Sequence, residues 1–557
     1  TPVVKVFPTA RATPIEFFAL SSYRAWAAAR SADDPTPSSV AYYKGLGTNT
    51  NDEAIAYFSS MTRYATTSLH TDECVTALKI ACAKGSSSDR RDILRLKSPH
   101  DTHDLYTADS FTTARFCTDE LTLFWQADNL RSIPGGIDGL KPSQRKTVFT
   151  ILSAGQSTKH KVAQLAADVA KKTNYHHGEA AMAGVIVNLA QTFFGSNNVP
   201  LLLPKGQFGN RHGEKPSQPR YIYTLPQPYL ASIFHPADNM VLDYLIDEGM
   251  QVEPRSFVPI IPMLVVNGSD GIGTGFSTTI PPHALGDVID RCRLVCERGV
   301  DTPLEPMLPF SHGFRGDMYV TDTAVEFVSQ SVWLDDKTLQ ISELPPGMKT
   351  NNLKDSLVDM DAVDDVINNS TGENVDLRVT FKDGMVPANV EKALKLKTTA
   401  STTNLHAFDT NGMLTKFDSA LDLLRLHARV RLDMYVLRCK CLIEKAEKEI
   451  ALVNTKIEFI EKVVAGEIDV MRTKRKALKE LLSQQFGPFA DDLLAMALDH
   501  LNEDGIADLK NKRDKKEAEK QSVASMTPQE CWLADIDAIE KKMAPLPRAP
   551  VPKKRAI

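Results

Sequence analysis

The feature that most constrains the fold is one helical pattern of more than forty residues. Between Ser419 and Val464, Leu, Val and Ile recur at helical spacing among Lys and Glu. A helix of about forty residues rises roughly 60 Å, a length typical of coiled coils and long arms. Residues 507–543 carry further helical patterns that suit a chain running back along the first helix. We therefore predict an antiparallel helical arm with a small dimer contact at its end.

The remaining length predicts several domains beside the arm. The chain has 557 residues, 42% of them hydrophobic and 24% charged, which is typical of a globular protein with three or four domains. The eight cysteines include no Cys-x-x-Cys pair, which argues against a zinc site or a disulfide framework and favours reduced thiols. The longest apolar run, FVPIIPMLVV, has about ten residues. A membrane helix needs roughly twenty, so no membrane partner is predicted.

Local patterns predict an α/β beginning and a β-rich middle. The first 66 residues contain the strand-like TPVVKVF, the helical SSYRAWAAAR and the capped helix TNTNDEAIAYF. Residues 303–397 alternate apolar and polar side chains in short runs, which indicates strands. The apolar MLVVN is also predicted to be a strand. The segment GSDGIGTGFSTTIPPHA after it is not a dinucleotide fingerprint, because its glycines are wrongly spaced and Pro281 and Pro282 stop the required helix.

Positive charge is concentrated in one segment of an acidic chain. The formal net charge is -5, yet residues 131–221 hold twelve Lys or Arg against four Asp or Glu. Two loops in this segment, RSIPGGIDGLKPSQRK and LPKGQFGNRHGEKPSQPR, are rich in glycine, proline and cations. Glycine lets a backbone approach a ligand closely and proline stiffens a loop, so both loops suit contact with a phosphate backbone. An ordinary solvated basic surface is the alternative.

Seven motifs follow one another in an order that resembles a known family. They are YYKGLGT, RSIPGGIDGLKPSQRK, KVAQLAADVAKKTNYHHGE, NLAQTFFGSNNVPLLLPKGQFGNR, PRYIYT, VEPRSFVPIIPMLVVNGSDGIGTGFS and TTNLHAFD. As an ordered set they resemble the type IIA DNA topoisomerases, and more narrowly the single-chain topoisomerase II of eukaryotes and large DNA viruses. Gyrase-type enzymes divide YKGLGT and DGLKPSQRK between two different chains, whereas both stand in one chain here.

The resemblance implies a multidomain fold of the α/β plus α class. Its parts would be a partial Toprim α/β domain, a winged-helix DNA-gate domain, a β-rich tower and a long antiparallel coiled-coil C-gate. The implied boundaries are 1–66 for the C-terminal part of the Toprim domain, 67–125 for a helical connector, 126–258 for the winged-helix domain with the catalytic tyrosine, 259–402 for the tower, 403–545 for the coiled-coil arm and exit-gate dimer domain, and 546–557 for a flexible basic tail.

The stretch PRYIYT supplies the candidate catalytic residues. Transient DNA breakage needs a nucleophile that attacks a backbone phosphorus and stores the bond as a phosphodiester, so that religation needs no cofactor. A tyrosine phenol suits this role, but its ordinary pKa is about 10, so it needs neighbouring cations. Arg220 directly precedes Tyr221, and its planar guanidinium can clamp a phosphate. By resemblance Tyr221 is the nucleophile and His177 assists at the reacting oxygens; Tyr223 would face the same side of a strand but does not follow Pro-Arg.

Further residues are predicted to contact DNA. Those that resemble phosphate-gripping cations of the family are Lys44, Lys141, Arg145 and Lys146. Ile272, within GIGTG, resembles the isoleucine that inserts between base pairs and bends the duplex. The histidine pair and the second basic loop add His176, Gln207, Arg211 and Lys215. The alternatives are ordinary solvated cations and, for Ile272, a core residue at a tight glycine turn.

The resemblance also implies cofactors, partners and a location. The family holds Mg²⁺ on carboxylates upstream of YKGLGT and binds ATP further upstream; no such carboxylate set precedes the motif here, so no metal ligand is predicted in this chain. The chain begins without Met and resembles the DNA-gate and exit-gate part of a longer ATP-driven enzyme. Alone it is expected to bind double-stranded DNA and form a homodimer, yet to cleave poorly. The implied location is the nucleus, or alternatively the mitochondrion or a viral factory in the host cytoplasm.

The predicted function is that of a type II DNA topoisomerase, which passes one duplex through a transient tyrosyl-5′-phosphate break in another. Two alternatives stay open. A tyrosine recombinase also joins tyrosine to DNA, although its Arg, His-x-x-Arg and Tyr set is not recognisable here. A non-catalytic architectural DNA clamp on a coiled-coil dimer would leave Tyr221 merely packed.

Overall fold

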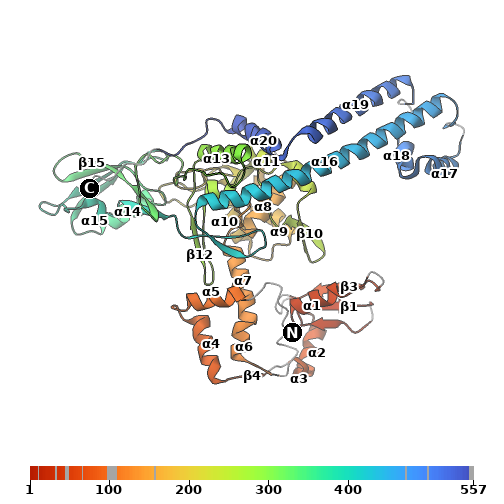
Figure 1. Cartoon of the computed structure of the whole chain (residues 1–557). Coiled ribbons are helices and arrows are strands. Elements are labelled where there is room, and N and C mark those ends of the chain that lie inside the picture. Colours follow the sequence, from red (N-terminus) through yellow and green to blue (C-terminus); the bar gives the residue numbers. More distant parts are fainter. Residues whose placement is uncertain are drawn as a thin grey trace.

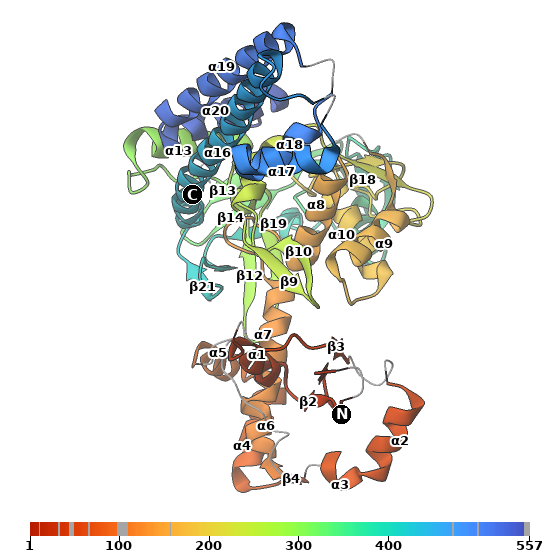
Figure 2. The same cartoon turned by 90° about the vertical axis from the view of Figure 1, so that its right-hand side faces the viewer.

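The computed structural model describes residues 1–9, 12–31, 34–43, 49–64, 67–96, 110–155, 158–470, 473–497 and 501–550. A central body carries a projecting helical arm on one side, and a smaller N-terminal unit is joined to the body through one connecting helix (Figure 1). A second view, turned by 90°, shows the same connection between the two units (Figure 2). The fold is a mixture of α and β elements.

The N-terminal unit is built on a small antiparallel sheet of order β2-β1-β3. Its elements are β1 (Val4–Phe7), β2 (Ile15–Phe17), α1 (Leu20–Ala28), β3 (Ser39–Tyr42), α2 (Asn51–Ser59) and α3 (Met61–Tyr64). The predicted capped helix is confirmed, because the Thr50 hydroxyl accepts from the Glu53 backbone N–H and the Glu53 carboxylate accepts from the Thr50 N–H. Lys5, nearly buried, pairs with Glu53 at 2.8 Å and so ties the helix to the sheet.

Helices connect this unit to the body. The connecting elements are β4 (Thr67–Leu69), α4 (Asp72–Cys82), α5 (Ser87–Leu96), β5 (Ser110–Thr112), α6 (Thr113–Thr118) and α7 (Glu120–Ser132). Both views show α7 running from the connecting helices into the body. The C-terminal end of α7 therefore lies beside elements of the body.

Three helices and a small sheet form the part of the body that carries Tyr221. The elements are α8 (Pro142–Ala154), β6 (His160–Lys161), α9 (Val162–Thr173), α10 (Glu179–Ala190), β7 (Leu202–Lys205), β8 (Tyr223–Pro226), α11 (Leu230–Ile233), η2 (Pro236–Met240), β9 (Tyr244–Asp247) and β10 (Met250–Pro254). Helices α8, α9 and α10 bury Val148, Val169 and Ile186 in one core. The sheet β6-β8-β7 is antiparallel.

A second set of elements completes the body and corrects one prediction. It comprises α12 (Met263–Asn267), β11 (Ser269–Ile272), β12 (Ser277–Ile280) and α13 (Leu285–Arg298). The segment MLVVN, predicted as a strand, is the short helix α12. Its first four side chains are all buried, and a short, fully buried apolar run has no periodicity that separates helix from strand.

Two buried histidines make the stability of the body depend on pH. Complete burial lowers the pKa of His283 from 6.5 to about 4 and that of His427 from 6.5 to about 3. Each donates a ring N–H to a backbone carbonyl, His283 to Val265 and His427 to Pro259.

We expect the free energy of unfolding to fall as the pH drops below 6.5. In that range the unfolded histidines bind protons that the folded ones do not, so each costs about 1.4 kcal/mol per pH unit until its folded pKa is reached. Urea unfolding at pH 7, 6 and 5 measures this slope. In the variant His283→Gln the free energy of unfolding should depend less steeply on pH than in the parent chain. Equal pH dependence would contradict the lowered pKa of His283.

The β-rich middle is confirmed as two antiparallel sheets, β13-β14-β19 and β15-β16-β18-β17. The elements are β13 (Asp317–Val320), β14 (Ala324–Val328), β15 (Gln330–Trp333), β16 (Thr338–Glu343), α14 (Thr350–Val358), β17 (Val363–Asn368), β18 (Leu377–Phe381), α15 (Val390–Ala393) and β19 (Lys397–Ser401). The hairpin of β20 (Leu405–Phe408) and β21 (Leu414–Phe417) follows. The four-stranded sheet has its own core around Leu339, Val379 and Phe381.

The predicted long helix is confirmed as α16 (Ala420–Val464), which has 45 residues and begins at its capping residue Ser419. The arm continues through α17 (Arg475–Phe486), η3 (Gly487–Phe489), α18 (Ala490–Leu494), α19 (Glu503–Ser525) and α20 (Pro528–Met543). Helix α19 runs antiparallel to α16, because Lys510 pairs with Glu461 and Lys520 pairs with Glu447. Figure 1 shows the two helices side by side along the arm.

A buried ionic cluster anchors the base of the arm. The Asp238 carboxylate of η2 accepts from Arg431 at 2.7 Å and from Arg438 at 2.7 Å, both on α16. Arg438 also donates to Asp535 of α20 at 2.7 Å, and Tyr435 donates to the same carboxylate. Burial alone would raise the pKa of Asp238, but the two guanidinium groups hold it below its ordinary value. Three elements distant in sequence are thus joined by charge.

The first residues of the predicted flexible tail make contacts with the body. Pro547 accepts a hydrogen bond from the Gly286 N–H, and Arg548 pairs with Asp290 of α13. These contacts hold the described part of the tail, residues 546–550, on the body, while residues 551–557 lie outside the described residues. Over the described ranges, no helix is both long and apolar enough to cross a membrane.

Candidate DNA-cleavage site

Tyr221 lies in the turn that leads into β8, with its side chain 67% exposed. The next residue, Ile222, is 2% exposed and anchors the turn in the core. The Tyr221 N–H donates to the Gln218 carbonyl at 2.9 Å, and the Ile222 carbonyl accepts from the Val162 N–H at 3.1 Å. The buried Ile222 and the hydrogen-bonded backbone thus hold the exposed phenol of Tyr221 in place. Tyr221 is therefore not an aromatic side chain packed in the core of this chain.

Arg220, the cation that the sequence predicts beside this phenol, lies over the Tyr221 ring. Its guanidinium carbon lies 4.9 Å from the centre of the Tyr221 ring, and both side chains are exposed. A phosphate that approached Tyr221 would therefore meet the arginine fork as well.

The structure adds two lysines that sequence reasoning did not single out. Lys159 Nζ lies 4.3 Å and Lys161 Nζ 5.8 Å from the centre of the Tyr223 ring. Strand β6 pairs with β8, with Lys161 opposite Tyr223, so both cations lie beside the tyrosine two residues after Tyr221. The only sequence signal was the net positive charge of residues 131–221.

The two histidines lie in the loop between α9 and α10. His176 Nε2 is 3.7 Å from carboxylate oxygens of both Asp247 and Glu248, at the β9–β10 turn. His177 is exposed, with its ring edge-on to Tyr175 at 5.3 Å between ring centres. His176 thus lies beside two carboxylates of the β9–β10 turn.

Arg145 and Lys146, both predicted to contact DNA, pair with carboxylates of the body, and their role as DNA contacts stays a prediction. Arg145 is 7% exposed and binds Asp138 through Nε at 2.6 Å and Nη2 at 3.0 Å. Lys146 donates to the Thr173 carbonyl at 2.6 Å and to Glu253 at 2.9 Å. Both side chains neutralise internal carboxylates of the body and so stabilise it from within.

The second basic loop divides in the same way. Arg211 is 4% exposed and pairs with the buried Glu343 of β16, so its side chain is held inside the body, and its role as a DNA contact stays a prediction. Gln207 and Lys215 are exposed, and Gln207 donates to Glu214 at 3.2 Å. The loop that leads to Tyr221 is thereby attached to the four-stranded sheet through its central arginine.

Lys141 and Ile272 belong to one local arrangement. Lys141 Nζ donates to the Asp270 carbonyl on β11 at 2.7 Å. Burial lowers the pKa of Lys141, and the nearby Asp270 charge acts in the opposite direction. Ile272, at the end of β11, is 85% exposed, which excludes a core residue. Lys44, in YYKGLGT, lies outside the described residues.

The resemblance to a magnesium-dependent family calls for a cluster of carboxylates. In the part of the chain that the structure describes, no group of three or more His, Cys, Asp or Glu side chains could hold a metal ion. The acidic, His and Cys side chains of the described residues therefore do not fit a Mg²⁺ site.

Two family models match nearly the whole chain. Residues 1–129 match the C-terminal associated domain of TOPRIM, and residues 131–537 match the model of the A subunit of DNA gyrase/topoisomerase IV. The class is thus that of the DNA topoisomerases that carry a TOPRIM-associated region in the same chain. The chain belongs to the family of the DNA gyrase/topoisomerase IV A subunits.

Curated relatives carry the name DNA topoisomerase 2. DNA topoisomerase 2, mitochondrial, of Dictyostelium discoideum is 32% identical over 97% of this chain and 44% of its own length. DNA topoisomerase 2 of Bombyx mori is 34% identical over 88% of this chain and 33% of its length. DNA topoisomerase 2-alpha of Sus scrofa is 32% identical over 98% of this chain and 39% of its length. The chain spans less than half the length of each.

A solved structure matches the fold. The Plasmodium falciparum topoisomerase II DNA-binding, cleavage and re-ligation domain is 32% identical, with a TM-score of 0.84 over 97% of this chain and 79% of the solved one. The mixed α/β architecture described above is therefore that of a topoisomerase II DNA-binding and cleavage domain.

Proposed function

We propose that this chain is the DNA-cleaving and religating part of a type II DNA topoisomerase, with Tyr221 as its nucleophile. One observation carries the proposal: a 67% exposed tyrosine has a guanidinium 4.9 Å from its ring. The relatives' names support the reaction class. The whole protein would be an ATP-hydrolysing isomerase that relaxes supercoils and decatenates DNA.

The proposed chemistry is a reversible exchange of phosphodiesters. Tyr221 Oη attacks the backbone phosphorus, the bond from phosphorus to the 3′ oxygen breaks, and the tyrosine becomes joined to the 5′ phosphate. The Tyr221 phenol gives up its proton and the departing 3′ oxygen takes one up, and His177 is the candidate that moves protons at these oxygens. Arg220 donates to the non-bridging oxygens and offsets the charge that grows on them. The 3′ hydroxyl later attacks the phosphotyrosine and restores the strand.

The domains are assigned within this proposal. Residues 1–66 are the end of a Toprim domain, 67–125 a helical connector, 126–258 a winged-helix domain, 259–402 a tower, and 403–545 the coiled-coil arm with the exit-gate dimer contact. The antiparallel pairing of α16 and α19 supports the last assignment. Two protomers would each supply one Tyr221, so that both strands of a bound duplex are cut.

Cofactors and location follow from the same proposal. Mg²⁺ and ATP would be bound by regions of the relatives' length that this chain does not span. When bound, Mg²⁺ would supply positive charge at the phosphate and ATP would supply the free energy of the cycle. The protein would act in the nucleus or, like the relative named mitochondrial, in the mitochondrion.

The test is to identify which DNA end carries protein. The full-length protein is incubated with magnesium and end-labelled supercoiled DNA, and the reaction is stopped with detergent. Protein on the 5′ ends of staggered double-strand breaks is the expected result. Linkage to 3′ ends would indicate a recombinase-type reaction, and the absence of any adduct would favour an architectural clamp.

Lys159 should contribute to DNA affinity through the phosphate backbone. We expect the binding constant of this chain for a short duplex to fall steeply with salt, and Lys159→Ala to reduce the log–log slope by about one. Titrations at several salt concentrations measure both slopes. Lys382→Ala is the control, because Lys382, directly after β18, donates to the carbonyl of Asp361, which precedes β17, and it should leave the slope unchanged. Equal slopes for both variants would contradict a phosphate contact at Lys159.

A further inference from the structure

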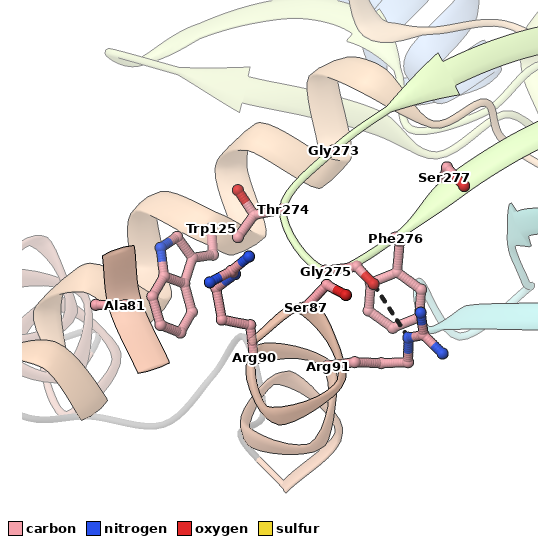
Figure 3. A pocket seen from close by; sticks show the side chains of 10 residues that line it. All are labelled: Ala81, Ser87, Arg90, Arg91, Trp125, Gly273, Thr274, Gly275, Phe276 and Ser277. Atoms are coloured by element: carbon pink, nitrogen blue, oxygen red, sulfur yellow. Dashed lines mark hydrogen bonds between the residues drawn. The ribbon is translucent and has the colours of Figure 1, made fainter. Parts of the chain in front are cut away.

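We infer that Arg91 and Asn129 are positioning residues that hold the Ile272 hairpin for DNA bending. The inference rests on the proposed function, because it takes Ile272 as the side chain that enters the duplex. Ile272 ends β11, which pairs with β12 in an antiparallel hairpin. The turn between these strands lies beside α5 and α7 (Figure 3).

The glycines on either side of Ile272 fix which way it points. A Cβ atom on Gly271 would lie 2.1 Å from the Ser132 carbonyl oxygen, and one on Gly273 would lie 2.1 Å from Asn129 Oδ1. The hairpin therefore rests against the C-terminal end of α7 with no room for a side chain on that face. Because strand residues alternate between faces, Ile272 points to the opposite face, where it is 85% exposed.

Polar contacts from α7 secure the turn. Asn129, which is 3% exposed, donates from Nδ2 to the Thr274 carbonyl at 3.0 Å. The Thr274 hydroxyl donates to Asp128 at 2.9 Å. At the base of the hairpin Lys141 donates to the Asp270 carbonyl. The turn is thus fixed from both ends by residues outside the hairpin.

Arg91 of α5 supplies the remaining contact. Its Nε donates to the Gly275 carbonyl at 3.0 Å, and its guanidinium carbon lies 5.4 Å from the centre of the Phe276 ring. A cavity of about 440 Å³ lies between the turn, α5 and α7, lined in part by Arg90, Arg91 and Trp125. On this side Phe276, which is 6% exposed, packs with Leu94 of α5 and Trp125 of α7. The Arg91 hydrogen bond to Gly275 fixes the turn itself beside this apolar contact.

Inserting an apolar side chain between base pairs costs several kcal/mol of unstacking. If the hairpin could move away from the DNA when Ile272 inserts, less of the binding free energy would be available to bend the duplex than if the hairpin is fixed against α7. Arg91 and Asn129 therefore act on bending through Ile272 rather than through a contact of their own with DNA.

The experiment measures bending and affinity separately. This chain is bound to a duplex with a fluorescent donor and acceptor at its ends, and energy transfer reports the ratio of bent to unbent complex. We expect Arg91→Ala and Asn129→Ala each to lower that ratio about tenfold, as loss of a hydrogen bond to a fixed partner does. The salt slope of binding should stay at the parent value. Arg91→Lys, which keeps a donor, should recover part of the bending.

Controls separate positioning from other roles. Arg95→Ala removes the same charge from the same helix, where Arg95 pairs with Asp92, and should leave bending unchanged. In an Ile272→Ala background, Arg91→Ala should have no further effect, because both changes act through one side chain. A drop of about one in the salt slope for Arg91→Ala, with bending intact, would make Arg91 a phosphate contact and overturn the inference.

The inference and the proposed function fail in different ways. If Ile272→Ala lowers bending while Arg91→Ala and Asn129→Ala do not, the positioning role is wrong and the wedge role of Ile272 stands. If Ile272→Ala leaves bending unchanged, the wedge role is wrong and the positioning inference falls with it. Neither bending result bears on Tyr221 as the nucleophile, because covalent cleavage of DNA is assayed separately.

Discussion

Replacing Tyr221 by Phe should reduce covalent DNA cleavage by a factor on the order of 10⁴ or more, as removal of a nucleophile does. The change deletes one oxygen and nearly preserves the volume of the side chain. Because the side chain is 67% exposed and lies in a turn rather than in the core, the fold and the binding of duplex DNA should be unaffected. The measurement is the amount of protein–DNA adduct trapped by detergent from the full-length protein with magnesium.

The chain offers a matched control two residues away. Tyr223→Phe removes the same oxygen from a side chain on the same side of the segment, and its ring stays beside Lys159 at 4.3 Å. We expect this variant to cleave at close to the parent rate. If Tyr223→Phe loses the adduct and Tyr221→Phe keeps it, then Tyr223 is the nucleophile and the assignment of Tyr221 is wrong. If both variants keep the adduct, neither tyrosine is the nucleophile.

The second large effect is expected on stability, at the base of the arm. Asp238→Ala would leave the buried Arg431, whose side chain is 0% exposed, without its carboxylate, and would leave Arg438, 7% exposed, with Asp535 alone. Breaking a buried ion pair in this way costs about 3–5 kcal/mol. Urea unfolding should detect this as a lower free energy of unfolding. Hydrogen exchange should report earlier opening where η2, α16 and α20 meet.

An exposed ion pair close by supplies the comparison. Asp243 pairs with Arg255 at 3.0 Å, with side chains 72% and 69% exposed. Asp243→Ala makes the same chemical change in water and should cost less than about 1 kcal/mol. If both variants lose equal stability, the buried cluster does not anchor the arm.

Long and locally capped elements were predictable from the sequence. The length of α16 follows from periodicity sustained over many turns, and the start of α2 follows from Thr50 and Glu53 three residues apart. The short helix α12 was not predictable, since its four consecutive buried residues have no polar face. Local patterns therefore identify elements with two distinguishable faces and fail for fully buried ones.

The candidate site shows the same limit. Tyr221 and Arg220 are neighbours in sequence, so their proximity could be predicted. The partners of Lys146 and Arg211 are Glu253 and Glu343, more than a hundred residues further on, and no local pattern indicates that these cations are neutralised inside the protein. Lys159 was missed for the converse reason, because only the pairing of β6 with β8 brings it close to Tyr223.

Helix α7 has a consequence for how the chain tolerates changes in length. The two family matches, 1–129 and 131–537, meet inside this helix, which runs from Glu120 to Ser132. An α-helix turns by about 100° per residue. One residue inserted into α7 would therefore rotate everything before it by that angle, whereas an insertion of about seven residues, close to two whole turns, would restore the angular phase and displace the unit along the axis by roughly 10 Å. The junction between the two regions is thus set in azimuth as well as in distance, which a loop of the same number of residues would leave undefined.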